Sequence, residues 1–512
     1  MTNGADSIIA TALDQGIEVC FANPGTTEMP LVAALDRAPR MRPVLALHET
    51  VCTGAADGYA RVAGKPALTL LHLGPGLANG AANLHNARRA VSPVVNLVGE
   101  HATWHKSADA PLAMDIEGLA RTFSAWVGTA ASADDMGRLA AEAVAIAKGR
   151  RAIATLIAPH DLQAIEVEAR SFSPPRYAGP SVDFAMIEAA ATALRQPKAA
   201  LYLGGAGLFG VGLERAGRVA AATGCTLIAP SSYNRLEVGR GLPTIHRLPY
   251  FATAAQAYLD GFTHVVGCGV DRPVSFFGWP GEPSRYLEGR EGVIWLSGLH
   301  EDALPFLDAL VQALDAKEPI ARYDAEMAQM PSGGPLTAET LVEVLAVGLP
   351  EDAILIPTAV TTGFAFAAHA GRARPHTQLA LTGGAIGMGP SLAVGAAIGA
   401  PGRKIVNLEA DGSGAYALQA FWTQAREGLD VTTIICHNRV YKILQIELER
   451  AGLAIGEASK HLTELDRPAL DWTGLARSLG LEAEKVDDVA GFAAALERGL
   501  ATPGPYLIEA MI

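Results

Sequence analysis

Two polar residues with hard oxygen donors follow two apolar runs near the C-terminal end of the chain. Asp411 opens an Asp-Gly-Ser-Gly turn after the run 404–410, and Asn438 closely follows the run 431–436. A helical stretch between the runs predicts parallel strands, whose carboxyl ends meet at one edge of a sheet. A carboxylate and an amide carbonyl beside a glycine-rich turn suit an octahedral cation bound to a diphosphate. The same pattern also fits an ordinary βαβ unit in which Asp and Asn are turn and capping residues.

This segment resembles the diphosphate-binding motif of the thiamine-diphosphate enzymes, which reads Gly-Asp-Gly, a long spacer, then Asn-Asn. The resemblance implies that Mg²⁺ is held by the side chains of Asp411 and Asn438 and by the backbone carbonyl of Val440. It also implies that Gly412 and Ser413 contact the cofactor.

Two positions depart from that pattern. Ala410 stands where the first glycine is expected, and His437 stands where the first asparagine is expected. Neither position supplies a metal ligand in the family scheme, so the resemblance still implies an intact metal site. The departures leave open a second interpretation, a non-catalytic relative that keeps only the fold.

The N-terminal part alternates strand-like apolar runs with glycine-containing turns and helical stretches. In order, these segments are 21–28, 43–49, 52–64, 67–80 and 93–101, and the run beginning at Leu73 predicts a glycine-rich turn before a helix. This order resembles the pyrimidine-binding domain of the 2-oxo-acid decarboxylases and acetolactate-synthase-like enzymes. The resemblance continues over essentially the whole chain. It implies a homodimer or homotetramer in which the first domain of one subunit and the third domain of its partner share each site.

Glu49 directly follows a short apolar run, and the resemblance makes it the residue that activates the cofactor. Thiamine becomes a nucleophile only after losing a very weakly acidic C2 proton. A buried carboxyl against the aminopyrimidine ring can start that proton transfer. The resemblance also places Ile386 beneath the cofactor, with the Gly384 carbonyl as the acceptor from its amino group. Met388, in the same glycine-rich stretch, is expected to contact the cofactor as well.

Thr26 and His72 are the other candidate catalytic residues. They align with a serine and a histidine of benzoylformate decarboxylase, and a hydroxyl with an imidazole suits carboxylate binding and proton movement. The second histidine of that decarboxylase has no counterpart in the stretch 271–279, which weakens a literal match. Three further residues either add protonation capacity or belong to a solvated loop: Glu100, His101 and His105.

Polar, proline-containing stretches at 166–182 and 315–335 divide the chain. Strands that alternate with helices throughout predict doubly wound parallel sheets. We therefore expect an α/β fold of three such domains, of the thiamine-diphosphate decarboxylase and carboligase type. The expected domains are pyrimidine-binding (PYR) at 1–165, middle at 183–314 and diphosphate-binding (PP) at 336–512.

The composition favours large buried cores, because half of the residues are hydrophobic and only 18% are charged. A formal net charge of −13 argues against nucleic acid or an anionic membrane as a partner. We expect a cytoplasmic protein, since the opening residues lack the pattern of a signal peptide and the five cysteines show no metal or redox spacing. The glycine run 204–207 lacks a full dinucleotide fingerprint, so we expect no FAD in the middle domain.

The resemblance implies a homo-oligomeric enzyme that uses thiamine diphosphate and Mg²⁺ and acts on a 2-oxo acid. The resemblance favours acetolactate-synthase-like carboligation through a decarboxylated enamine intermediate. Simple decarboxylation, as in benzoylformate decarboxylase, is the alternative. Ile443 and Leu444, just after the metal motif, favour a small or hydrophobic 2-oxo acid, which the sequence does not name.

Overall fold

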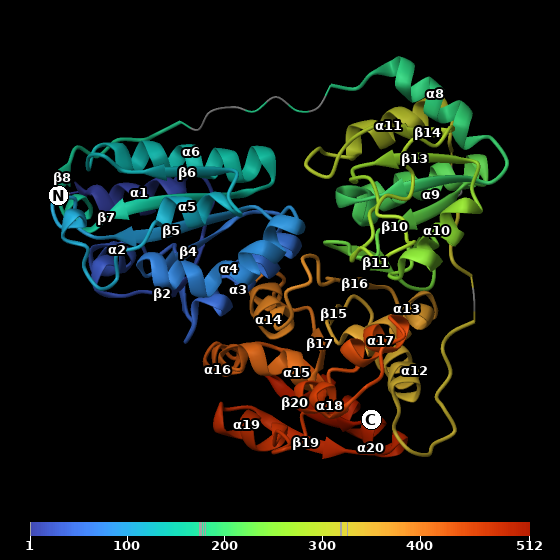
Figure 1. Ribbon diagram of the computed structural model, residues 1–512. Helices are drawn as coiled ribbons and strands as arrows, with labels where there is room; N and C mark the ends of the chain where they lie inside the picture. The colour runs from blue at the N-terminus through green and yellow to red at the C-terminus, as the bar shows by residue number, and fades with distance from the viewer. Residues whose placement is uncertain (1, 174–176, 178, 180, 318–319, 325) are drawn as a thin grey trace.

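The computed structural model describes residues 2–173, 177, 179, 181–317, 320–324 and 326–512. Its strands form sheets of six, five and seven strands and a small antiparallel pair, β1 (Thr2–Asn3) with β8 (Glu166–Val167). Figure 1 shows the three large sheets as three bodies, with the first and second side by side above the third. Among the described residues, no helix has the length and apolar character needed to cross a membrane.

The first sheet is entirely parallel and runs in the order β3-β2-β4-β5-β7-β6. Its strands are β2 (Val19–Asn23), β3 (Arg42–Leu45), β4 (Ala67–Leu71), β5 (Val94–Glu100), β6 (Trp126–Thr129) and β7 (Ile153–Pro159). Alternate residues enter different cores: Phe21 packs on the side of α3 (Glu49–Ala63) and α4 (Leu73–Arg89). Cys20 packs on the side of α1 (Gly4–Asp14) and α6 (Asp135–Arg150). This period of two is expected for a strand that is buried on both faces.

The second sheet is also parallel, in the order β12-β10-β9-β13-β14. Its strands are β9 (Ala199–Leu203), β10 (Thr226–Ala229), β12 (Ile245–Arg247), β13 (His264–Cys268) and β14 (Val293–Trp295). Its helices are α8 (Phe184–Leu194), α9 (Gly210–Thr223), α10 (Ala252–Asp260) and α11 (Leu304–Ala313).

The third sheet runs in the order β11-β16-β15-β17-β18-β20-β19. Its strands are β11 (Leu236–Val238), β15 (Ile354–Pro357), β16 (His376–Gln378), β17 (Ile405–Ala410), β18 (Val431–His437), β19 (Glu482–Val486) and β20 (Tyr506–Met511). All neighbours are parallel except β11, which pairs antiparallel with β16. β11 lies within the range expected for the middle domain, yet it completes the edge of the third sheet. The three-domain boundaries themselves stay a prediction.

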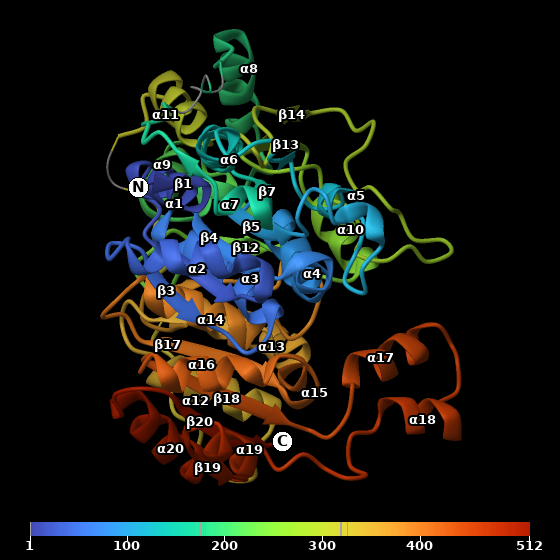
Figure 2. The same ribbon diagram turned by 90° about the vertical axis from the view of Figure 1, so that its left-hand side faces the viewer.

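Helices flank the third sheet, except that two of them project away from it. The helices are α12 (Ala338–Gly348), α13 (Val360–His369), α14 (Met388–Gly399), α16 (Gln419–Arg426), α17 (Lys442–Arg450), α18 (Glu457–Thr463), α19 (Trp472–Ser478) and α20 (Val489–Ala501). Figure 2 shows α17 and α18 projecting together away from the rest of the third body. No residue of α17 is buried within this chain.

Helix α3 of the first body packs closely against α14 of the third. A β-carbon at Gly58 would collide with the backbone of Leu392, and one at Gly395 would collide with the backbone of Ala55. Glycine is therefore needed at this crossing for the two backbones to approach. The contact ties the helix that begins at Glu49 to the helix that follows the glycine-rich loop 383–387.

The glycine-rich turn predicted from Leu73 onward is wrong, because this stretch forms the first turns of α4. Its glycines serve close packing instead. A β-carbon at Gly80 would lie 2.7 Å from a methyl carbon of Thr53, and one at Gly76 would lie 3.0 Å from a carboxyl oxygen of Glu49. The small residues thus let α4 lie directly against the start of α3.

Candidate functional site

The ends of β17 and β18 bring Asp411 and the Asn438 turn together, because these strands are parallel neighbours. Asp411 is 1% exposed, and its Oδ2 accepts a hydrogen bond of 2.7 Å from the backbone N–H of Arg439. Its Oδ1 accepts another of 2.9 Å from the Gly412 N–H. Burial raises the pKa of the Asp411 carboxyl, while these N–H donors and His437 act in the opposite direction. Asn438 Oδ1 accepts from the Val440 N–H at 3.0 Å, which shapes the second turn.

Glu409 lies directly beneath this turn and is fully buried. Its carboxyl accepts hydrogen bonds from the hydroxyls of Thr358, at 2.8 Å, and Ser413. Burial raises the pKa of Glu409, which these hydroxyls partly oppose. The hydroxyl of Ser413 is therefore directed into the protein and fixes the turn, and the expected contact of Ser413 with the cofactor stays a prediction. Glu409 was not among the site residues predicted from the sequence.

The loop before α14 borders a cavity of about 190 Å³, which Gly384 and Ile386 both line. Gly384 and Gly387 have φ angles of +76° and +85°, a region that favours glycine. Asn86 of α4 holds the loop, since its side chain donates to the Ala385 carbonyl at 2.9 Å and accepts from the Ala385 N–H at 3.2 Å. Met388 is fully buried, so its side chain packs under the loop and is not exposed to the cavity.

Aromatic side chains form much of the cavity wall. They come from segments far apart in the sequence, and the cavity lining includes Tyr250, Phe276, Phe277, Phe364, Ile443 and Leu444. Arg247 also lines this largely apolar cavity and brings a guanidinium group to its wall. Its Nε donates to the Ser231 carbonyl at 2.7 Å, and it lies 5.4 Å from the ring centroid of Phe364. Only Ile443 and Leu444 of this wall were predictable, since they follow the metal motif, whereas no local sequence pattern marks the aromatic residues.

Glu49 is the first residue of α3 and is 8% exposed. Its Oε2 accepts a hydrogen bond of 3.0 Å from Asn79. In the described part of the chain, the residues that line the Ile386 cavity all lie at or beyond position 232. Glu49 of the same chain therefore does not border this cavity.

His72 pairs with a carboxylate that the sequence analysis missed. Its Nδ1 lies 2.7 Å from Oε2 of Glu28, which is fully buried and also accepts from the Gly25 N–H. Thr27, whose hydroxyl donates to Glu28 at 2.6 Å, lies 3.4 Å from the imidazole, whereas the predicted Thr26 is exposed. The glutamate binds one ring nitrogen of the imidazole, Nδ1, and leaves Nε2 for other partners. The sequence did contain a local indication of this contact, because Glu28 follows the turn residue Gly25 by three positions and accepts from its N–H.

Glu100 is the last residue of β5, and the residues after it form a partly exposed loop. Glu100 is 5% exposed and pairs with Lys106 at 3.1 Å. The rings of His101 and His105 meet edge to face with centroids 5.5 Å apart. Their part in protonation stays a prediction.

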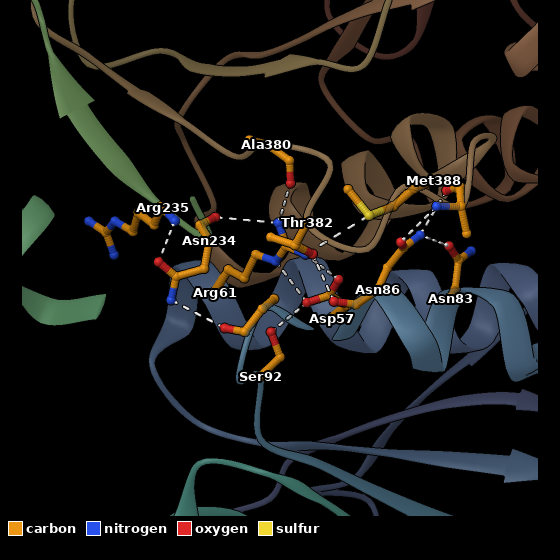
Figure 3. A network of polar contacts seen from close by, with 12 residues as sticks. Asp57, Arg61, Asn83, Asn86, Ser92, Asn234, Arg235, Ala380, Thr382 and Met388 are labelled. Atoms are coloured by element: carbon orange, nitrogen blue, oxygen red, sulfur yellow. Dashed lines mark hydrogen bonds and ion pairs between the residues drawn. The ribbon is translucent and has the colours of Figure 1, made fainter. Parts of the chain in front are cut away.

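A buried ion pair on α3 joins all three bodies (Figure 3). Arg61 pairs with Asp57 at 2.6 Å, and both side chains are 1% exposed or less. The Arg61 guanidinium also donates to the carbonyls of Ala380 at 2.7 Å and Asn234 at 3.3 Å, and to the Thr382 hydroxyl at 3.0 Å. It thus braces the segment that leads into the loop of Gly384.

Replacing Arg61 by leucine is expected to lower the free energy of unfolding by about 3–5 kcal/mol, since it leaves Asp57 buried without its cation. Urea denaturation followed by circular dichroism measures the loss. Arg61→Leu combined with Asp57→Asn should recover part of it, because the uncompensated charge is gone. Equal stability of the single variant and the wild type would contradict this account of the network.

Comparison with known proteins decides the family. Residues 2–119 match the thiamine pyrophosphate enzyme N-terminal TPP binding domain, and residues 360–510 match the corresponding C-terminal TPP binding domain. The chain is a thiamine pyrophosphate enzyme. The family predicted from the sequence is thereby confirmed, and the two matched regions contain Glu49 and Asp411 respectively.

Two curated relatives are similar over nearly the whole enzyme. The Mycobacterium tuberculosis protein IlvX, which carries the name of an acetolactate synthase large subunit, is 45% identical over 100% of this chain and 99% of its own. A benzoylformate decarboxylase from Pseudomonas aeruginosa is 30% identical over 96% of both chains. The enzyme is thus of the acetolactate synthase and benzoylformate decarboxylase type.

Solved structures confirm the predicted fold. A 4-hydroxybenzoylformate decarboxylase from Rhodococcus jostii RHA1 superposes with a TM-score of 0.85 at 22% identity, over 99% of this chain and 98% of that one. A benzoylformate decarboxylase from Polynucleobacter necessarius gives 0.86 at 19% identity, over 100% and 99%. At these identities the likeness establishes the α/β architecture alone.

Proposed function

We propose that this enzyme binds thiamine diphosphate through Mg²⁺ at the turns that follow β17 and β18. The donor set supports the fit: Asp411 supplies a buried carboxylate and Asn438 an amide oxygen at adjacent strand ends. A carbonyl from Val440 would complete three hard ligands, which is the chemistry that Mg²⁺ prefers. A β-carbon at Gly412 would lie 2.4 Å from the Tyr441 ring, so a larger residue in the turn would have to displace that ring.

When bound, thiamine diphosphate supplies a carbon nucleophile that attacks the carbonyl of a 2-oxo acid. Glu49 would start this chemistry by passing a proton from its carboxyl to the pyrimidine ring. Asn79 holds the Glu49 carboxyl at 3.0 Å, which fixes its direction. His72, oriented by Glu28, would donate or remove protons on the substrate side.

We infer that the substrate is a 2-oxo acid with an apolar side chain, and that the acyl unit left after decarboxylation is transferred to a second carbonyl compound. The observation that carries this function is the apolar cavity that opens at Gly384 and Ile386. The relative with 45% identity over the full length, named as an acetolactate synthase large subunit, supports carboligation.

Simple decarboxylation is the second candidate. The aromatic wall of Tyr250, Phe276, Phe277 and Phe364 suits an aryl side chain. The relative named benzoylformate decarboxylase supports this alternative. Incubation of the loaded enzyme with a panel of small and aryl 2-oxo acids, with and without acceptor aldehydes, separates the two. Mass spectrometry should find a joined product for carboligation and a free aldehyde for decarboxylation. No consumption of any 2-oxo acid would contradict both.

The active enzyme is proposed to be a homodimer, or a tetramer of two such dimers, with each site shared between subunits. Glu49 does not border the Ile386 cavity of its own chain, which supports a site that Glu49 of a partner subunit would complete. The segment formed by α17, α18 and the loop between them also exposes apolar side chains that a partner subunit could bury. Leu444, Leu453 and Leu462 in this segment are 48%, 57% and 75% exposed.

Two inactive variants should restore activity when they are mixed. A dimer of one Glu49→Ala subunit and one Asp411→Ala subunit contains one doubly defective site and one intact site. Random exchange makes about half of the dimers mixed, so roughly a quarter of all sites should be wild type. Co-expression, with mixing verified by native mass spectrometry, measures the recovered activity. Full mixing without recovery would exclude the shared site.

A further inference from the structure

Arg247 is the last residue of β12, and it lines the same cavity as Gly384 and Ile386. Its Nε donates to the Ser231 carbonyl at 2.7 Å. In the part of the chain that the structure describes, neither of its Nη atoms takes part in a hydrogen bond or an ion pair. A guanidinium is always charged and carries five N–H donors in a planar fork. Arg247 therefore keeps a charged edge with unused donors.

Two aromatic rings fix the position of this guanidinium. Its central carbon lies 5.8 Å from the ring centroid of Tyr233 and 5.4 Å from that of Phe364. The Tyr233 hydroxyl donates to the side chain of Gln378 on β16, which fixes that ring in turn. A side chain held by such contacts loses little conformational freedom when a ligand binds. The guanidinium of Arg247 is thus preorganised for a planar partner.

The described lining of the cavity offers no anion that would neutralise Arg247. Glu447 of α17 is the only carboxylate among these residues, and both of its oxygens accept from Arg450, at 3.2 and 3.0 Å. The other residues of this lining carry no charge. A cation in such surroundings is costly unless an anion joins it. A carboxylate matches the guanidinium fork with two parallel hydrogen bonds, and every 2-oxo acid has one.

We propose that the guanidinium of Arg247 binds a substrate carboxylate in the Ile386 cavity. This inference rests on the proposed function and deepens it, because it names a residue that determines specificity for acids.

Two carboxylates have the required chemistry: that of the 2-oxo acid that loses CO₂, and that of a second 2-oxo acid that accepts the acyl unit. During decarboxylation the negative charge leaves the first carboxylate. A cation bound to it would stabilise the substrate more than the transition state. The carboxylate of the acceptor persists through the reaction, so it is the better partner for Arg247.

Binding of benzoate and benzamide tests the proposal without catalysis. The two probes have nearly the same shape, only benzoate is charged, and neither is a 2-oxo acid. By calorimetry, the full-length enzyme loaded with thiamine diphosphate and Mg²⁺ should bind benzoate about 10–100-fold more tightly than benzamide. Arg247→Met should lose this preference, and Arg247→Lys, which keeps the charge without the fork, should retain part of it.

Arg426→Met is the matched control for the loss of a guanidinium that stacks on a ring. The Arg426 guanidinium lies 5.3 Å from the ring centroid of Trp422, but it is exposed and does not line the cavity. This variant should keep the preference of the wild type. A wild type without preference for benzoate, or a folded Arg247→Met variant that keeps the preference, would overturn the proposal and leave the proposed function intact.

Turnover then shows which carboxylate Arg247 binds. With a 2-oxo acid as acceptor, Arg247→Met should raise the apparent KM of the acceptor about 10–100-fold. With benzaldehyde, which has no carboxylate, the KM of the acceptor should equal that of the wild type. A raised KM of the donor with either acceptor would assign Arg247 to the donor carboxylate. Unchanged KM values for both acids would overturn the proposal. No consumption of any 2-oxo acid by the wild type would instead contradict the proposed function.

Discussion

Replacing Asp411 by alanine is expected to weaken cation-dependent binding of thiamine diphosphate by more than about 100-fold. Asp411 is the only carboxylate of the proposed clamp, and the remaining protein donors are an amide and a backbone carbonyl. The substitution also removes the acceptor of the Arg439 and Gly412 N–H groups, so the two turns lose their common anchor. Isothermal titration calorimetry with cofactor and Mg²⁺ measures the loss.

A matched control keeps this test specific. Asp430 precedes β18 on the same sheet, but its side chain is half exposed and pairs with Lys404. Asp430→Ala should therefore bind the cofactor as the wild type does. Unchanged affinity in Asp411→Ala, with the fold verified by circular dichroism, would place the cation site elsewhere.

Replacing Glu49 by glutamine is expected to lower kcat by about 10²–10⁴-fold while cofactor affinity is retained. The amide has nearly the same shape and can still contact Asn79, but it cannot supply the proton that the carboxyl supplies. Exchange of the cofactor C2 proton for deuterium, followed by NMR of the quenched complex, should slow to a similar degree.

Glu18→Gln is the control for this substitution, because Glu18 pairs with Lys65 near the surface, away from the proposed site. It should leave both turnover and exchange unchanged. Near wild-type exchange in Glu49→Gln would remove Glu49 from the proton relay. A lost affinity for the cofactor, with exchange intact in the fraction that is bound, would make it a binding residue.

The parts of the site that follow from local sequence were predictable. Asp411 and Asn438 stand at the ends of apolar runs, and the parallel pairing of β17 and β18 brings those ends together as expected. The resemblance also pointed to Gly384 and Ile386 in the glycine-rich stretch 383–389, and both line the cavity. The family and the α/β fold followed from the order of such segments, and the comparisons confirm both.

The parts of the site that depend on distant contacts were not predictable. Glu28 and His72 are separated by 44 residues, and Arg61 reaches Ala380 across 319. No periodicity or spacing in the sequence indicates such pairs, because tertiary packing brings the two residues together. The turn predicted at the glycines after Leu73 is wrong for the same reason, because a glycine needed for helix packing cannot be told from a turn glycine in the sequence.

The pairing of β11 with β16 bears on how this enzyme could be divided. Three residues of the central part of the chain, Leu236–Val238, cover what would otherwise be the open edge of the third sheet. A fragment that begins at residue 336 would therefore carry the proposed cation ligands but leave unpaired the backbone N–H and C=O groups of β16 that face β11. Open strand edges promote association with other chains. Dissection into separately expressed pieces should thus yield aggregates rather than a working cofactor domain, unless the segment carrying β11 is supplied with them.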